Sequence, residues 1–175
     1  MAHWGTKEQA LRAVARYGTA LQHAGEEQRA DRDIVLTAVA QAGHALRYAS
    51  AELRADRDVV LAAVAENGFA LEHAAGELQA DRDVVLAAVT TGGWALPYTA
   101  ADPLPLGQLQ RSQPTGNHPF QFAAAELRAD RDFVLVAVAQ DGNSLGCAAG
   151  ALQSDPILCE LCALDPHVSA PLLAA

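Results

Sequence analysis

The feature that most constrains this fold is a short phrase, Asp-Arg-Asp, that returns at a nearly fixed spacing. Its four copies begin at Asp31, Asp56, Asp81 and Asp130. The first three start 25 residues apart, and the fourth follows after 49, one residue short of two periods. A period of this size is typical of stacked repeats, in which each unit is too small to bury its apolar face alone.

The unit at residues 56–80 shows how one repeat is expected to fold. Asp56 is a good N-cap, because its carboxylate can accept hydrogen bonds from the free N–H groups of a first helical turn. Leu61 and Val64 follow at helical spacing and are expected on the buried side. Gly68 is expected to end the helix in a left-handed conformation, and a second, shorter helix then packs back on the first.

The same columns recur along the chain, so each unit is predicted to be a helical hairpin of about 25 residues and the whole an all-α solenoid. The recurring positions are Leu11, Leu36, Leu61, Leu86 and Leu135 in the first helix, Gly18, Gly43, Gly68, Gly93 and Gly142 after it, and Leu21, Leu46, Leu71, Leu96 and Leu145 in the second helix. We expect one domain, 1–175, with units at 6–30, 31–55, 56–80, 81–102, a degenerate 103–129 and 130–154, and a C-terminal cap at 155–175.

A Pro/Gly-rich stretch near 103–117 interrupts this pattern and reads as a loop. At His118 the pattern of the second helix resumes, with Phe120 in the Leu column and Phe122 in a column of Tyr and His. The interval is therefore interpreted as a unit that lost its first helix. Two readings of the loop stay open, a solvated remnant of a decayed repeat and a partner-binding loop on a rigid frame.

Composition argues against several functional classes. The formal charge is −9 and the pI about 5.0, with no basic block, so nucleic acid and anionic membrane surfaces are poor partners. We expect no transmembrane segment and no signal peptide, because no apolar run is long enough and the first residues lack a basic start. Three cysteines do not make a disulfide framework. These features favour an intracellular protein, in the cytoplasm or an organelle.

The unit at 56–80, with its Asp-Arg-Asp-Val-Val-Leu-Ala-Ala-Val start and the later Gly-Phe-Ala-Leu and Glu-Leu, resembles a helical repeat known as domain of unknown function 4116. The resemblance covers residues 6–154 apart from 103–117. It implies tandem helical hairpins and, by analogy, a scaffolding role. The family has no agreed catalytic residues, so it implies none here.

The Asp-Arg-Asp phrases resemble paired catalytic carboxylates. Because they recur in every unit, we interpret them as helix caps and as a ladder of Asp–Arg contacts between neighbouring units. One column holds His23, Tyr48 and His73, and we interpret it as a packing position with a polar tip. The chain is not expected to be an enzyme or to carry a cofactor.

The C-terminal cysteines form the one candidate metal site. Cys159 and Cys162 stand in a Cys-x-x-Cys pattern, with Cys147 upstream and His167 downstream, a set that could hold a structural zinc. The pair is expected on one apolar helix, where cysteine is an ordinary small core residue. Core packing is the favoured reading, and a metal or redox role is the alternative.

The favoured hypothesis is a non-catalytic scaffold for protein–protein contacts, such as an accessory or linker subunit of a larger assembly. Its partners would be other proteins, such as the subunits of a large complex. The alternative is a metal or redox protein that uses the C-terminal Cys/His group. The candidate partner contacts are the tryptophans, the loop and its flank, because aromatic and loop residues often dominate interfaces: Trp4, Trp94, Pro103, Leu104, Leu106, Gln110, Arg111 and His118.

Overall fold

The computed structural model describes residues 6–91 and 118–164, and every regular element in these two ranges is a helix. Long α-helices begin each unit: α1 (Lys7–Arg16), α3 (Arg32–Gln41), α5 (Arg57–Glu66), α7 (Arg82–Thr91) and α9 (Arg131–Gln140). A 3₁₀ helix follows each: η1 (Gly18–His23), η2 (Gly43–Tyr48), η3 (Gly68–His73), η4 (Pro119–Phe122) and η5 (Gly142–Cys147). Short α-helices follow four of these: α2 (Glu26–Arg29), α4 (Ala51–Arg54), α6 (Gly76–Gln79) and α8 (Ala125–Ala129). The last described helix is α10 (Pro156–Leu164).

The predicted all-α solenoid with units of about 25 residues is confirmed, but each complete unit has three segments instead of two. The second segment is a 3₁₀ helix, and the stretch between it and the next Asp-Arg-Asp phrase, to which the sequence pattern assigned no helix, forms a short α-helix of its own. In the unit at 31–55 this helix is started by Ser50, whose hydroxyl accepts a hydrogen bond from the Leu53 N–H at 3.4 Å.

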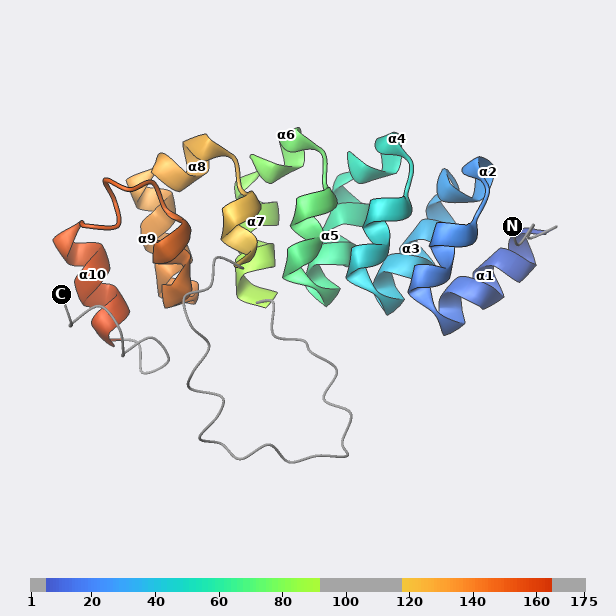
Figure 1. Ribbon diagram of the computed structural model, residues 1–175, viewed down its shortest axis with the longest axis horizontal. Coiled ribbons are helices and arrows are strands. Elements are labelled where there is room, and N and C mark those ends of the chain that lie inside the picture. Colours follow the sequence, from blue (N-terminus) through green and yellow to red (C-terminus); the bar gives the residue numbers. More distant parts are fainter. Residues whose placement is uncertain (1–5, 92–117, 165–175) are drawn as a thin grey trace, which may run out of the picture.

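Successive units stack side by side. Helices α1, α3, α5 and α7 each contact the next, as do η1 to η5, and the short helices α2, α4, α6 and α8 form a row along the upper edge of Figure 1. Backbone hydrogen bonds join the units where one short helix ends and the next begins: the Ser50 N–H donates to the Arg29 carbonyl at 2.9 Å, and the Ala75 N–H donates to the Arg54 carbonyl at 2.9 Å.

The core lies between the long helices. In α5 the fully buried residues are Val59, Val60, Ala63 and Val64, and the equivalent positions of α3, α7 and α9 are buried too. Leu61 was predicted to share this buried side but is only half-buried, packed on the margin of the core. The small Val and Ala side chains occupy the inter-helix contact because they let neighbouring helices approach closely, which places the larger Leu column at the edge.

The glycine column has a different role from the one predicted. No left-handed backbone angle is found at Gly18, Gly43 or Gly68, and the residue before each is extended, with φ between −156° and −143°. A Cβ added at Gly43 would collide with the carbonyl oxygen of Ala63 in the next unit. The predicted left-handed helix stop is therefore wrong at these three positions. Glycine is required because the 3₁₀ helix begins in direct contact with the next long helix.

Residues 81–91 and 119–129 pack as one unit. The Ala124 N–H donates to the Gln79 carbonyl at 2.9 Å, which repeats the bonds between earlier units with a sequence offset of 49 in place of 25. Helix α7 contacts both η4 and α9. The boundary expected between units 81–102 and 103–129 lies outside the described residues. Helix α7, before this boundary, is the first segment of a single repeat, and η4 and α8, after it, are the last two segments of the same repeat.

The first and last described helices each pack on a neighbouring unit. Helix α1 buries Ala10 and Val14 and exposes Glu8, Arg12 and Arg16, and it contacts α3. At the other end, α10 packs on α9 and η5. Its N-cap is Asp155, whose carboxylate accepts from two backbone N–H groups of the first turn at 2.9 and 3.3 Å.

Candidate interaction surface

The Asp-Arg-Asp phrases form a continuous charge ladder along the starts of the long helices. The first Asp of each phrase caps its own helix, and the Arg reaches the next unit. Arg57, for example, pairs through Nε with Asp81 at 3.3 Å and through Nη2 with Asp83 at 2.7 Å. The predicted ladder of contacts between neighbouring units is confirmed. Its cations are Lys7, Arg32, Arg57, Arg82 and Arg131, each paired with an Asp of the following unit.

The ladder continues from Arg82 to Asp130, across the interval in the sequence. The Arg82 guanidinium also lies over the ring of Phe133, 5.2 Å from its centroid. Partial burial raises the pKa of Asp56, but the Val59 N–H and the Arg32 guanidinium outweigh burial and hold that pKa below its usual value. The ladder carboxylates therefore serve capping and stacking, and the lowered pKa of Asp56 keeps that group ionised at neutral pH.

The cations outside the ladder have no carboxylate partner among the described residues. They are Arg12, Arg16, Arg29, Arg47, Arg54 and Arg128. Arg47 is exposed and lies over the ring of Tyr48, 5.1 Å from its centroid. The Nε atoms of Arg29, Arg54 and Arg128 are buried and have no hydrogen-bond acceptor among the described residues. These six arginines are spread over α1, α2, η2, α4 and α8.

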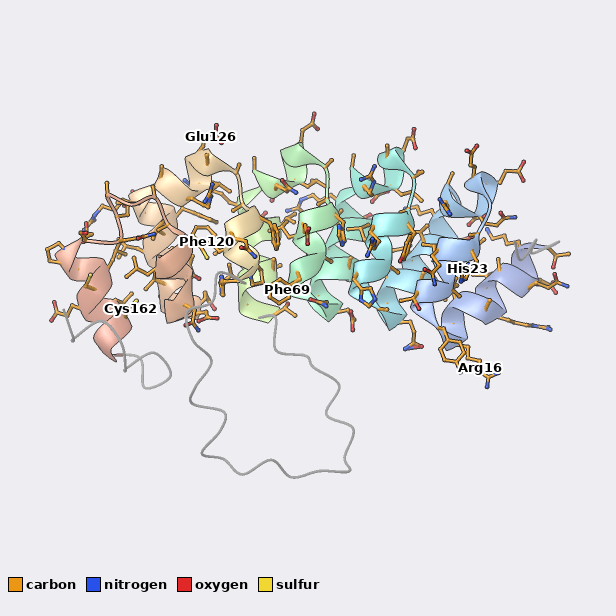
Figure 2. The ribbon with its side chains drawn as sticks, in the orientation of Figure 1. Arg16, His23, Phe69, Phe120, Glu126 and Cys162 are labelled. Carbon is orange, nitrogen blue, oxygen red and sulfur yellow. The ribbon has the colours of Figure 1, made fainter. Side chains whose placement is uncertain are left out.

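A row of aromatic and imidazole side chains follows the 3₁₀ helices. His23, Tyr48, His73 and Phe122 occupy one column, and Phe69 packs edge-on against Phe122 with ring centroids 6.5 Å apart. All but the exposed His23 are half-buried. Figure 2 places His23 and Phe69 between the short helices, which carry Glu126 at the upper edge, and the lower edge, which carries Arg16. The row therefore lies apart from the upper edge that the short helices form.

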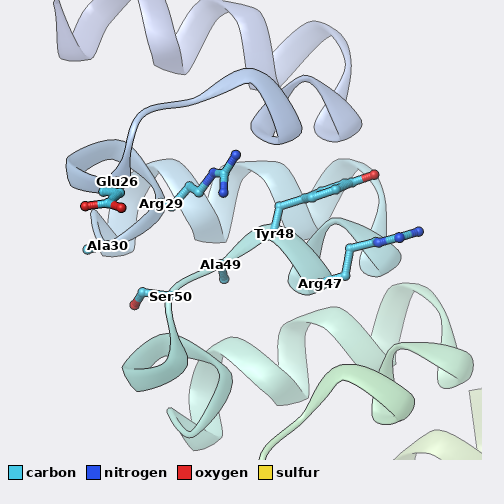
Figure 3. A pocket seen from close by; sticks show the side chains of 7 residues that line it. All are labelled: Glu26, Arg29, Ala30, Arg47, Tyr48, Ala49 and Ser50. Atoms are coloured by element: carbon cyan, nitrogen blue, oxygen red, sulfur yellow. The ribbon is translucent and has the colours of Figure 1, made fainter.

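A shallow hollow of about 390 Å³ lies where the first two units meet (Figure 3). Arg29 and Tyr48 point into the same open space from α2 and η2, and Glu26, Arg47 and Ser50 complete its rim along with Ala30 and Ala49. The Nη2 of Arg29 donates to the Gln22 carbonyl at 2.8 Å, which fixes the guanidinium against η1. The hollow is mixed in charge, with two arginines and one glutamate.

Basic side chains of the second unit, 31–55, also act on His73 in the third unit, 56–80. Partial burial lowers the pKa of His73, and the charges of Arg47, His44 and Arg54 lower it further, against the opposing charge of Glu72. Arg47, His44 and Arg54 therefore all lie close to His73. The surface made by Arg29, Arg47, Tyr48, Arg54 and His73, across the 3₁₀ helices and the short helices α2 and α4, is named here the arginine face.

His118, one of the candidate partner contacts, lies at a contact between units. Its Nδ1 accepts from the Phe120 N–H at 3.2 Å, its Nε2 bonds Asp141 at 3.1 Å, and its side chain is 12% exposed. Burial opposes a charge on the ring, but Asp141, together with the Cys147 thiol, raises the pKa of His118 to about 9. The protonated ring would lose the bond from the Phe120 N–H, since Nδ1 would then carry a hydrogen.

The candidate metal residues do not converge among the described positions. No group of three His, Cys, Asp or Glu side chains suited to a metal is found in 6–91 and 118–164. Cys162 is buried and its thiol donates to the Gly142 carbonyl at 3.3 Å, whereas Cys159 donates to the Gln153 carbonyl at 3.4 Å. Cys147 is half-buried beside His118. His167 lies outside the described residues, so its part in the metal alternative stays a prediction.

Most of the other candidate contacts also lie outside the described ranges: Trp4, Trp94, Pro103, Leu104, Leu106, Gln110 and Arg111. The arginine face was not predicted from the sequence. One signal for it was available, because Arg29, Arg47 and Arg54 are among the basic residues of the first two units that fall outside the Asp-Arg-Asp phrase.

Comparison with known proteins identifies the repeat. The family described as domain of unknown function DUF4116 matches residues 6–54 and 56–100, in tandem and over more than half of the chain. The chain belongs to this family. Neither curated proteins nor solved structures gave a match. In the structure the repeat continues beyond the second DUF4116 match, through η4, α8, α9 and η5. None of the helices in the described ranges has the length and apolar character needed to cross a membrane.

Proposed function

We propose that this DUF4116 protein is a non-catalytic, protein-binding solenoid that serves as an accessory or linker subunit of a larger assembly. The observation that carries the proposal is the row of Tyr48, His73 and Phe122, half-exposed in register along the 3₁₀ helices. The Val and Ala positions and the charge ladder are buried or paired in contacts between units, whereas this row remains partly accessible. Aromatic residues and arginines are the side chains most enriched where proteins bind one another.

The shape of the molecule supports the same proposal. Repeat proteins present an extended surface in which each unit adds a similar strip, and they bind partners along several units at once. Here Tyr48 and the adjacent Arg47 lie between two units, so a partner could contact both. The carboxylates that resemble catalytic pairs are occupied as caps and ion pairs.

An intracellular location is part of the proposal. None of Cys147, Cys159 and Cys162 forms a disulfide. Free thiols persist in reducing compartments, where disulfides are rare.

The test is site-specific photo-crosslinking in an extract of the source cells. A photoreactive phenylalanine analogue replaces Tyr48 in one variant and the exposed Glu52 of α4 in a control variant. We expect discrete higher-mass adducts from position 48 and few from position 52, and mass spectrometry then names the partner. Discrete adducts from position 52 alone, or none from either position while the chain migrates at its own mass of 18.3 kDa, would contradict the proposal.

A further inference from the structure

We infer that the arginine face binds an acidic peptide segment, extended along the solenoid, with a carboxylate at about every third residue. This inference rests on the proposed protein-binding function and names the chemistry of the partner. The observation behind it is the division of the cations into two groups. Ladder cations are all paired, whereas Arg29, Arg47 and Arg54 have no carboxylate partner among the described residues.

The arginine face is a local positive region on an acidic protein. Arg47, Arg54 and His44 all lie near enough to act on the charge of His73, as does Glu72 with the opposite sign. Arg29 and Arg47 line the same hollow, which also holds Glu26. Unpaired guanidinium groups that are held in place lose little freedom when they bind a carboxylate. Arg29 is held in this way by its bond to the Gln22 carbonyl, and Arg47 by contact with Tyr48.

The repeat sets the spacing of the ligand. Arg29 and Arg54 occupy the same position of successive units, whose packed helices are separated by about 10 Å. An extended peptide rises about 3.3 Å per residue, so three residues span one unit. Carboxylates three residues apart would therefore face Arg29 and Arg54, whereas the next unit carries Gln79 at this position. The aromatic column, with Tyr48 and Phe122, offers apolar contacts for the residues between the carboxylates.

A peptide fits better than a nucleic acid. The row of short helices that includes Arg29 and Arg54 also carries a column of exposed glutamates, among them Glu52 and Glu77, and the chain as a whole is strongly acidic. A nucleic acid bears a charge at every nucleotide and is wide enough to meet these glutamates, which would repel it. A narrow peptide can place a few carboxylates on the arginines and avoid the acidic edge.

The test uses fluorescence anisotropy at low salt with a labelled peptide, Glu-Ser-Pro repeated four times, whose proline keeps it extended. Matched probes are the same peptide with Gln for Glu, a peptide of equal composition with its glutamates contiguous, and a single-stranded RNA of twelve nucleotides. We expect saturable binding of the spaced peptide, with a dissociation constant on the order of 0.1 mM, and weaker binding of every other probe.

The protein variants are chosen from the repeat itself. Arg47→Gln and Arg54→Gln each introduce the residue that other units carry at that position, Gln121 and Gln79 respectively, and Gln79 bonds three carbonyls there. The double variant should therefore fold, and circular dichroism checks this. We expect it to bind the spaced peptide about tenfold more weakly. The control, Arg12→Gln with Arg16→Gln, removes the same charge from α1 and should change binding less than about twofold.

Three results would overturn the inference: no saturable binding of the spaced peptide, equal loss in both double variants, or tighter binding of the RNA. Photo-crosslinking from position 48 separates this inference from the proposed function. If position 48 still forms adducts in the extract while the acidic peptide fails to bind, the proposed protein-binding function is supported and the inference of an acidic peptide ligand is contradicted.

Discussion

The glycine at the start of each 3₁₀ helix supports a sharp prediction, because the repeat offers a matched control. Gly43→Ala would place a methyl group against the carbonyl oxygen of Ala63, a backbone atom that cannot rotate away, with the Asn67 Cβ 3.0 Å from it. Gly76→Ala, at the start of α6, would meet no atom within 4 Å. Both substitutions remove the same conformational freedom from the unfolded chain.

The expected magnitudes follow from these contacts. The reduced entropy of the unfolded chain stabilises either variant by about 0.4–1 kcal/mol. At Gly43 the units must also move apart, and overpacking of this kind costs about 1–3 kcal/mol. Gly43→Ala should therefore be destabilised by roughly 1–2 kcal/mol, and Gly76→Ala slightly stabilised. For a chain of this size, the melting temperature changes by about 2–4 °C per kcal/mol.

The assay is thermal and urea unfolding followed by circular dichroism at 222 nm. We expect Gly43→Ala to melt several degrees below the wild type and Gly76→Ala at or slightly above it. Gly18→Ala and Gly68→Ala should behave like Gly43→Ala, because their added Cβ atoms meet the Ala38 and Ala88 carbonyls in the same way. Equal melting temperatures for Gly43→Ala and Gly76→Ala would refute the close contact between units.

Three further predictions concern titration and thiol reactivity. The pKa of His118 is raised to about 9, so its contribution to stability is complete below pH 6.5 and lost between pH 6.5 and 9. The free energy of unfolding should fall by at most about 3 kcal/mol over this range, because protonation of the ring also breaks the hydrogen bond from the Phe120 N–H. His118→Phe introduces the residue found at the equivalent Phe69. In urea unfolding, this variant should no longer show a dependence of stability on pH between 6.5 and 9. A slope that persists in the variant would contradict this assignment. The lowered pKa of Asp56 predicts a second loss of stability as the pH falls below about 4, which the same titration measures and a flat profile would exclude. In native protein, iodoacetamide should label Cys159 and spare the buried Cys162 until urea unfolds the chain; equal labelling before unfolding would show that α10 does not pack as described.

The parts of the fold that recur in every unit could be predicted from the sequence. The period, the Asp caps and the charge ladder were all visible, because each repeats with the same residues at the same spacing. The buried Leu46 and Leu71 of the 3₁₀ helices were visible for the same reason. Repetition reveals which positions matter structurally, even where a single copy would be ambiguous.

What repetition does not reveal is why a position is fixed. Gly43 and Leu61 are both invariant among the clear copies, yet the first is fixed by contact with a neighbouring backbone and the second lies at the edge of the core. Backbone proximity between units depends on tertiary packing, which a periodic pattern does not encode. The arginine face was missed for a related reason, because its members differ between units and only the structure separates paired from unpaired cations.

The central claim is that one continuous stack runs through the interval in the sequence, with residues 119–129 completing the unit that α7 begins. Deleting residues 94–117 tests it most directly, because it joins Gly93 to His118 and restores the 25-residue spacing between Asp81 and Asp130. We expect this variant to unfold in one transition at or above the wild-type midpoint in urea. Deletion of 92–117, two residues out of register, should be clearly less stable. If the in-register deletion unfolds the chain, or if both deletions are equally stable, the continuous stack is contradicted.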